Sequence, residues 1–141
     1  MLAIDPANWS ALWIRGKAFQ SLGEHAKAVE SFRSAYRINA DQPDVSRELA
    51  EGLLQTGRFG EAENIAREVS DRSPQDAGLK ANLALALLLD GHVSAAQQAI
   101  AEALRLDPTD AISKALARRI DDVASGARPQ PKSLAELQGR E

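Results

Sequence analysis

The sequence predicts an all-α fold in which three helix–turn–helix repeats stack side by side as an α-solenoid and a C-terminal helix caps the stack. Two observations predict it. Strong helix formers such as Ala, Leu, Glu, Arg and Gln dominate the 141 residues, whereas aromatic residues, which favour strands, make up 4%. Glycine recurs every 34 residues, at Gly23, Gly57 and Gly91. A period of this length is typical of stacked helical pairs.

Four further columns of small or apolar residues keep the same register. A small residue is needed where the helices of one pair approach closely, because a larger side chain would overpack the contact by roughly 1–3 kcal/mol. The recurring glycine supplies the left-handed residue that ends the first helix of each pair. The columns are Ala28, Ala62 and Ala96; Gly16, Ala50 and Ala84; Phe19, Leu53 and Leu87; and Ala35, Val69 and Ala103.

The period divides the chain into repeat 1 (9–42), repeat 2 (43–76) and repeat 3 (77–110). Each repeat has a first helix, helix A, and a second, helix B. Asn8, Asp76 and Asp110 stand where a helix begins, and each side chain can cap an N-terminus. The expected ranges are 9–22, 43–56 and 77–90 for helix A, and 25–39, 59–72 and 93–106 for helix B.

The C-terminal end of the stack needs a cover, because a repeat cannot bury its apolar face alone. Residues 111–125 predict a capping helix whose apolar face carries Ile112, Leu116, Ile120 and Val123. Residues 126–141 begin with a Gly- and Pro-containing stretch. They predict a flexible tail.

The N-terminal end has no such cover in the sequence. Residues 1–8 match the end of a preceding, truncated repeat, because Ile4-Asp5-Pro6 aligns with Leu106-Asp107-Pro108. We therefore expect the natural protein to continue upstream. The N-terminal face, with Trp9 and Trp13, would then lack its partners.

Repeat 1 resembles the tetratricopeptide repeat (TPR) pattern of small, aromatic and turn-glycine positions. The resemblance covers residues 9–110 and implies a right-handed α-solenoid whose A helices line a concave groove. Ser46 and Lys80 depart from it, because the family often has Trp at that position. The matching residues are Gly16, Phe19, Gly23, Ala28, Phe32 and Ala35.

The resemblance also implies which residues would bind a partner in the groove. This surface is aromatic and cationic at one end, charged in the middle and leucine-rich at the other. Some of its members have an alternative role: Trp13 can pack against a preceding repeat, leucines can pack under the capping helix, and the charged residues can pair with one another. The candidates are Trp13, Lys17, Gln20, Arg47, Glu48, Glu51, Leu54, Asn82, Leu85 and Leu89.

Some TPR proteins hold the C-terminal carboxylate of a heat-shock chaperone in a clamp of basic and amide side chains. The resemblance places Trp13, Lys17, Glu48, Gly78 and Asn82 at the clamp positions. These residues would not neutralise a carboxylate, so the sequence disfavours a chaperone clamp.

Composition and motifs predict no enzyme, no cofactor and no metal site. There is no Cys, and His25 and His92 lie at turn positions outside any metal-ligand spacing. The net charge of −3 comes without a basic stripe, which argues against nucleic acid. The longest apolar run, 83–89, is too short to be an integral membrane segment. We expect a soluble protein, with the cytoplasm slightly favoured over the periplasm.

We therefore expect a protein–protein interaction module that binds a partner peptide or helix in its concave groove. The alternative is a self-associating or docking segment of a larger multidomain protein whose chemistry lies elsewhere. In that case the uncapped N-terminal face would pair with a second copy in a homo-oligomer, or the Pro-rich tail would occupy a neighbour's groove.

Overall fold

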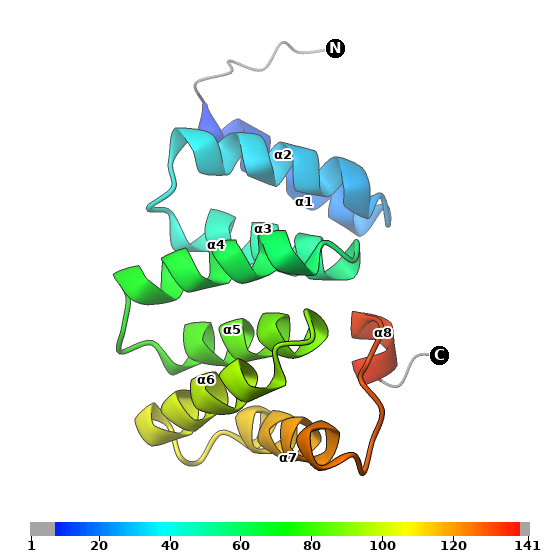
Figure 1. The fold of residues 1–141 in the computed structure, drawn as a ribbon. Coiled ribbons are helices and arrows are strands. Elements are labelled where there is room, and N and C mark those ends of the chain that lie inside the picture. The colour runs from blue at the N-terminus through cyan, green and yellow to red at the C-terminus, as the bar shows by residue number, and fades with distance from the viewer. Residues whose placement is uncertain (1–7, 139–141) are drawn as a thin grey trace.

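A computed structural model describes residues 8–138, and every regular element in that range is a helix. Figure 1 shows three antiparallel pairs stacked one on another, with a seventh helix at the far end and a short eighth helix that returns beside the stack. The helices are α1 (Trp9–Ser21), α2 (His25–Ile38), α3 (Pro43–Gln55), α4 (Phe59–Arg72), α5 (Ala77–Leu89), α6 (Val93–Leu106), α7 (Ala111–Ser125) and α8 (Leu134–Leu137).

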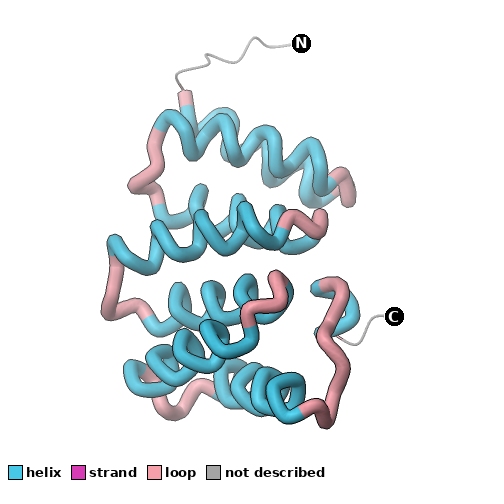
Figure 2. The backbone as a smooth tube through the Cα atoms, in the orientation of Figure 1, coloured by secondary structure: helices cyan, strands magenta, loops and turns pink. Residues whose placement is uncertain are grey.

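The three pairs α1–α2, α3–α4 and α5–α6 agree with the predicted all-α solenoid, and the bounds of their helices match the expected helix ranges to within one residue. Short loops join successive helices through α7, whereas a longer loop leads from α7 to α8 (Figure 2). Among residues 8–138, no helix combines the length and apolar character that a membrane span requires.

Each helix A ends in the same hydrogen-bonded turn. Gly23, Gly57 and Gly91 have φ angles of 75°, 78° and 82°, as the glycine spacing predicts. In repeat 1 the backbone N–H of Glu24 donates to the carbonyl of Phe19 at 2.9 Å. The equivalent bonds in repeats 2 and 3 are 2.8 and 2.9 Å long, which shows that the three turns share one geometry.

Three predicted N-caps are present. The side chains of Asn8, Asp76 and Asp110 accept hydrogen bonds from the backbone N–H three residues on, each at 3.1 Å. Asp110 also accepts from the Ser113 hydroxyl at 2.6 Å, and these bonds to the carboxylate lower the pKa of Asp110.

The small residues lie at the centre of each helical pair. Ala28, Ala62 and Ala96 are at most 1% exposed. One apolar cluster joins repeats 1 and 2 around Phe32 and Leu53 and includes Ala86 and Leu89 of repeat 3, and a second joins repeat 3 to α7 around Ile120. The capping helix therefore buries the end of the stack, as its apolar face predicts.

The apolar face of α7 is rotated from the expected one. Ile112 is 78% exposed, whereas Ser113 is 3% exposed. The expectation that Ile112 joins the buried face is therefore wrong. Capping by Asp110 turns Ser113 inward, and the positions in line with it along the helix are Leu116 and Ile120.

The prediction of a flexible tail over 126–141 is wrong for residues 130–137, which pack against the stack, whereas residues 126–129 are exposed. Gly126 has φ 82° and redirects the chain after α7. Pro131 is fully buried, Leu134 is 8% exposed, and Leu134 belongs to the apolar cluster of repeats 1 and 2. Apolar burial therefore anchors this segment. The proposed match of residues 1–8 to a preceding repeat lies outside the described residues, except for Asn8.

On the face away from the groove, polar side chains link successive B helices. Arg33 of α2 contacts Glu61 of α4 at 2.7 Å. The Tyr36 hydroxyl donates to Glu68 at 2.7 Å. Burial raises the pKa of Tyr36, and the bond to Glu68 raises it further, although Arg72 acts in the opposite direction.

We expect Gly16→Ala to destabilise the fold by about 1–3 kcal/mol through overpacking. An added Cβ would lie 2.5 Å from the ring of Phe32, which is 0% exposed. Repeats 2 and 3 accept Ala at this position because Ala66 and Ile100 replace the phenyl ring. Urea denaturation measures the change. The control is Gly60→Ala, at an exposed helical site, which should be neutral or stabilising. Equal stability of Gly16→Ala and the native chain would contradict this packing.

We expect the single tyrosine of the chain to titrate above its ordinary pKa of about 10. Since the folded-state pKa is raised, the stability that this phenol contributes is present below pH 10 or so and is lost as the pH rises through the folded pKa. Tyrosinate ultraviolet absorbance measures the midpoint. Glu68→Gln should lower it, whereas Glu61→Gln, which removes the partner of Arg33, should not. If the midpoint of the tyrosine titration is the same in Glu68→Gln and the native chain, the hydrogen bond between Tyr36 and Glu68 is contradicted.

Candidate functional site

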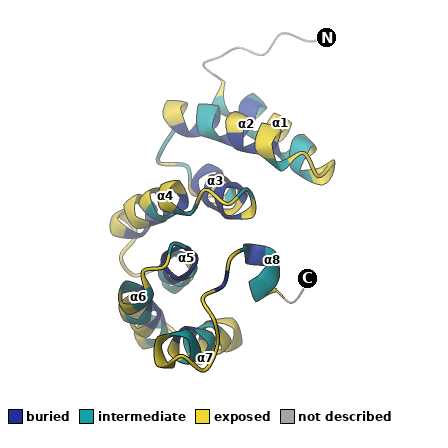
Figure 3. Ribbon diagram, turned by 45° about the vertical axis from the view of Figure 1, so that its right-hand side comes forward, coloured by how far each residue is buried: buried dark blue, intermediate teal, exposed yellow. Residues whose placement is uncertain are grey.

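The A helices α1, α3 and α5 lie on one side of the stack and the B helices α2, α4 and α6 on the other, as Figure 3 shows. The returning segment and α8 lie on the side of the A helices. This side is the predicted groove, and α8 contacts α3 there.

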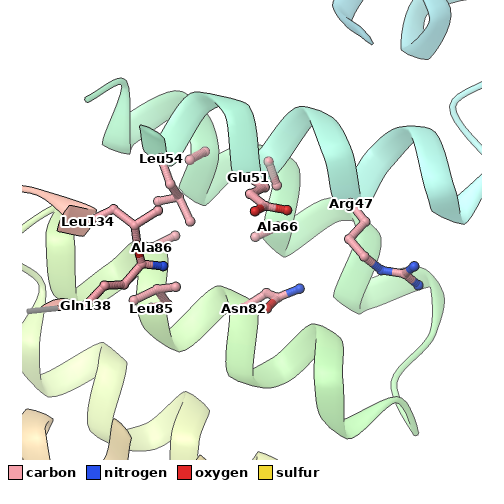
Figure 4. Close-up of a pocket in the computed structure, with 11 residues that line it drawn as sticks. Arg47, Glu51, Leu54, Ala66, Asn82, Leu85, Ala86, Leu134 and Gln138 are labelled. Atoms are coloured by element: carbon pink, nitrogen blue, oxygen red, sulfur yellow. The ribbon is translucent and has the colours of Figure 1, made fainter. Parts of the chain in front are cut away.

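A pocket of about 280 Å³ opens between α3 and α5 on this face (Figure 4). Its volume is near the lower end of the range for ligand sites, which suits one or two side chains rather than a whole helix. Five of the predicted binding residues meet in it. The lining residues are Arg47, Ala50, Glu51, Leu54, Ala62, Ala66, Asn82, Leu85, Ala86, Leu134 and Gln138.

The middle of the pocket is polar. Glu51 of α3 and Asn82 of α5 reach into the space between the two helices (Figure 4). Neither side chain forms a hydrogen bond or an ion pair with another of residues 8–138. An amide offers a donor and an acceptor together, and a carboxylate adds a second acceptor. The pair can therefore bind the N–H and C=O groups of a peptide backbone.

The two ends of the pocket differ in chemistry. Arg47 lies at one end and forms a salt bridge of 3.4 Å with Asp44 of the same helix. Leu54, Leu85 and the tail residue Leu134 form the opposite, apolar end (Figure 4). The surface thus carries a cation, an amide and an apolar patch along one line.

The predicted residues of repeat 1 do not line this pocket. Lys17 and Gln20 of α1 both contact Glu48 of α3, at 3.1 and 3.0 Å. The side chain of Glu48 is 17% exposed. These three residues link repeat 1 to repeat 2, which is the pairing between helices that the sequence left open as an alternative.

Trp13 and Leu89 also pack against the protein itself. Trp13 is partly buried against the core cluster, and its indole N–H has no hydrogen-bond partner among the described residues. Leu89 is 4% exposed and belongs to the same cluster as Leu54 and Leu134. The exposed apolar residues near the N-terminal end are Ile14 and Leu22 instead.

Sequence reasoning missed the tail residues that line the site. Gln130 donates from Nε2 to the carbonyl of Leu88 at 2.6 Å, and Leu134 and Gln138 line the pocket. One signal was present: Ser133 and Glu136 stand three residues apart, the spacing of a capping box. Such a box predicts a helical turn, but it does not say where the turn will pack.

One cluster outside the groove has a geometry that a metal could use. Side-chain ligand atoms of Glu63, Asp90 and His92 lie within 4.8 Å of one another. Glu63 already contacts His92 at 3.0 Å and Arg67 at 2.9 Å. These contacts account for the arrangement as a partly buried polar cluster between repeats 2 and 3.

Comparisons with solved structures show the same architecture. The first TPR of Spaghetti (RPAP3), bound to the HSP90 peptide SRMEEVD, superposes with a TM-score of 0.75 at 14% identity, over 89% of this chain and 99% of that chain. MamA from Desulfovibrio magneticus RS-1 gives a TM-score of 0.72 at 21% identity, over 95% and 76%. The second TPR domain of human RPAP3, in complex with the HSP70 peptide SGPTIEEVD, gives 0.72 at 18%, over 81% and 98%.

A search of the curated proteins found no match. The sequence matches the tetratricopeptide repeat model twice, over residues 19–77 and 53–120. Together the two matches span most of the three repeats and reach into α7. The chain belongs to the tetratricopeptide repeat family.

Proposed function

We propose that this chain is a non-catalytic interaction module that binds a short peptide segment of a partner protein between α3 and α5. The observation that supports this most directly is the pocket with an apolar end in which Glu51 and Asn82 form no hydrogen bond or ion pair with another of residues 8–138. A backbone amide of the peptide would bind the polar pair, and an apolar side chain would fill the space near Leu54 and Leu85.

The architecture supports a peptide as the ligand. The similar TPR domains of Spaghetti (RPAP3) and human RPAP3 were solved with an HSP90 and an HSP70 peptide, respectively. An acidic peptide that ends in a carboxylate is a poor fit here, because the Lys17 ammonium contacts Glu48 at 3.1 Å. The proposed ligand is therefore an internal, mainly apolar segment.

The described residues offer little that would support catalysis. His92 is exposed and contacts Glu63, and His25, the first residue of α2, forms no ion pair with another of residues 8–138. A binding surface without a reacting group is the function that this geometry supports best.

Selection of peptides from a random display library on the intact chain tests the proposal. Selected peptides should bind Asn82→Ala at least fivefold more weakly, because loss of a hydrogen bond from a partly buried amide is worth about 1 kcal/mol or more. Fluorescence anisotropy measures the affinity. Asn64→Ala, which removes an exposed amide on α4, is the matched control and should leave binding unchanged. If the selected peptides bind Asn82→Ala and Asn64→Ala with equal affinity, the binding surface does not include Asn82.

A further inference from the structure

The segment from 127 to 138 returns to the A-helix face and packs on α3 and α5 as a bound peptide would. After Gly126 the Arg128 backbone N–H donates to the carbonyl of Asp122 at 3.1 Å, which turns the chain back toward the A helices. Residues 126–130 are exposed. The segment therefore reaches the groove through a solvated connection, and its contacts begin at Gln130.

Four residues anchor the segment. Gln130 donates to the carbonyl of Leu88, near the C-terminus of α5. Pro131 is fully buried. Leu134 is 8% exposed and lies beside Leu54 and Ala86 in one cluster, while Leu137 packs against both apolar clusters of the molecule.

The last anchor residues stand on a single helical turn that caps itself. The Ser133 hydroxyl accepts from the Glu136 backbone N–H at 3.1 Å, and the Glu136 carboxylate accepts from the Lys132 backbone N–H at 3.0 Å. A single turn is unstable by itself in water. It is held in place by the apolar side chains that it buries on α3 and α5, as a docked peptide is.

We infer that residues 128–138 are a resident ligand of the groove, and that a partner binds by replacing them with a segment of the same chemistry. This inference rests on the proposed function. The partner segment would carry a proline, a leucine three residues later and a second leucine three residues after that, with a capping serine before the first leucine. The template for each position is Pro131, Leu134, Leu137 and Ser133.

The exposed connection, residues 126–130, tethers the tail, and the tail therefore competes with a partner for the groove. A short flexible tether holds its ligand at an effective concentration of the order of millimolar. A partner's apparent dissociation constant is its intrinsic value divided by the fraction of open groove. If the tail occupies the groove nine-tenths of the time, releasing it should tighten partner binding about tenfold.

Substitutions in the full chain test this. Leu134→Ser combined with Leu137→Ser removes the apolar anchors and should open the groove. The probe is a fluorescent peptide with the sequence of residues 127–138. It should bind the opened chain at least tenfold more tightly than the native chain. Lys132→Ser, at an exposed position of the same segment, is the control and should behave like the native chain. Circular dichroism checks that each variant is folded.

Two results would overturn the inference: equal binding of the probe to the opened and native chains, or no binding to either. Should the double variant fail to fold, Pro131→Ser gives a milder opening with the same readouts. Peptides selected from the library distinguish the proposed partner site from the proposed resident ligand. If they bind through Asn82 while opening the tail changes nothing, the groove is a binding site and the resident-ligand idea is wrong. If the probe binds the opened chain but no selected peptide depends on Asn82, the proposed partner site is wrong instead.

Discussion

The close approach of helices A and B within each pair is the constraint on which the rest of the structure depends. Ala28, Ala62 and Ala96 are essentially inaccessible to solvent, so no side chain larger than a methyl group fits there without displacing a helix. In repeat 1 the constraint is tighter still, because Phe32 fills the space beside Gly16. Once the pairs are fixed, their stacking leaves the A helices on one face.

Much of this architecture was predictable because it is periodic. Gly23, Gly57 and Gly91 mark the ends of the A helices through a backbone conformation that side chains rarely adopt. Asn8, Asp76 and Asp110 mark helix starts through a local hydrogen bond. Local signals of this kind do not depend on what lies across the molecule, and the sequence carries them in full.

The candidate site was predictable only in part, because its chemistry depends on contacts between distant residues. Arg47, Glu51, Leu54, Asn82 and Leu85, five of the predicted binding residues, line the pocket. Glu48 does not, since Lys17 and Gln20 bind it from the neighbouring repeat. Ile112 was assigned to the wrong face because one capping bond sets the rotation of α7. The docking of Leu134 has no periodic counterpart, and no spacing rule predicts it.

Repeats 1 and 2 are thus joined on both faces. Glu48 links α1 to α3 on the concave side, and Tyr36 with Glu68 links α2 to α4 on the convex side. Repeat 3 packs on repeat 2 through α4 and α5, with Ala86 and Leu89 in the first apolar cluster, and it packs on α7 through the second cluster. The pocket between α3 and α5 lies between repeats 2 and 3.

The docked tail affects how well ligands of this protein would be detected by a shift in melting temperature. A compound that fills an empty groove raises the melting temperature in proportion to its binding free energy. Here an incoming segment must first displace Pro131 and Leu134, whose burial already stabilises the native state. The melting temperature would then record only the difference between two occupants. A tight ligand could produce a small thermal shift, so direct measurement of association is the more sensitive screen.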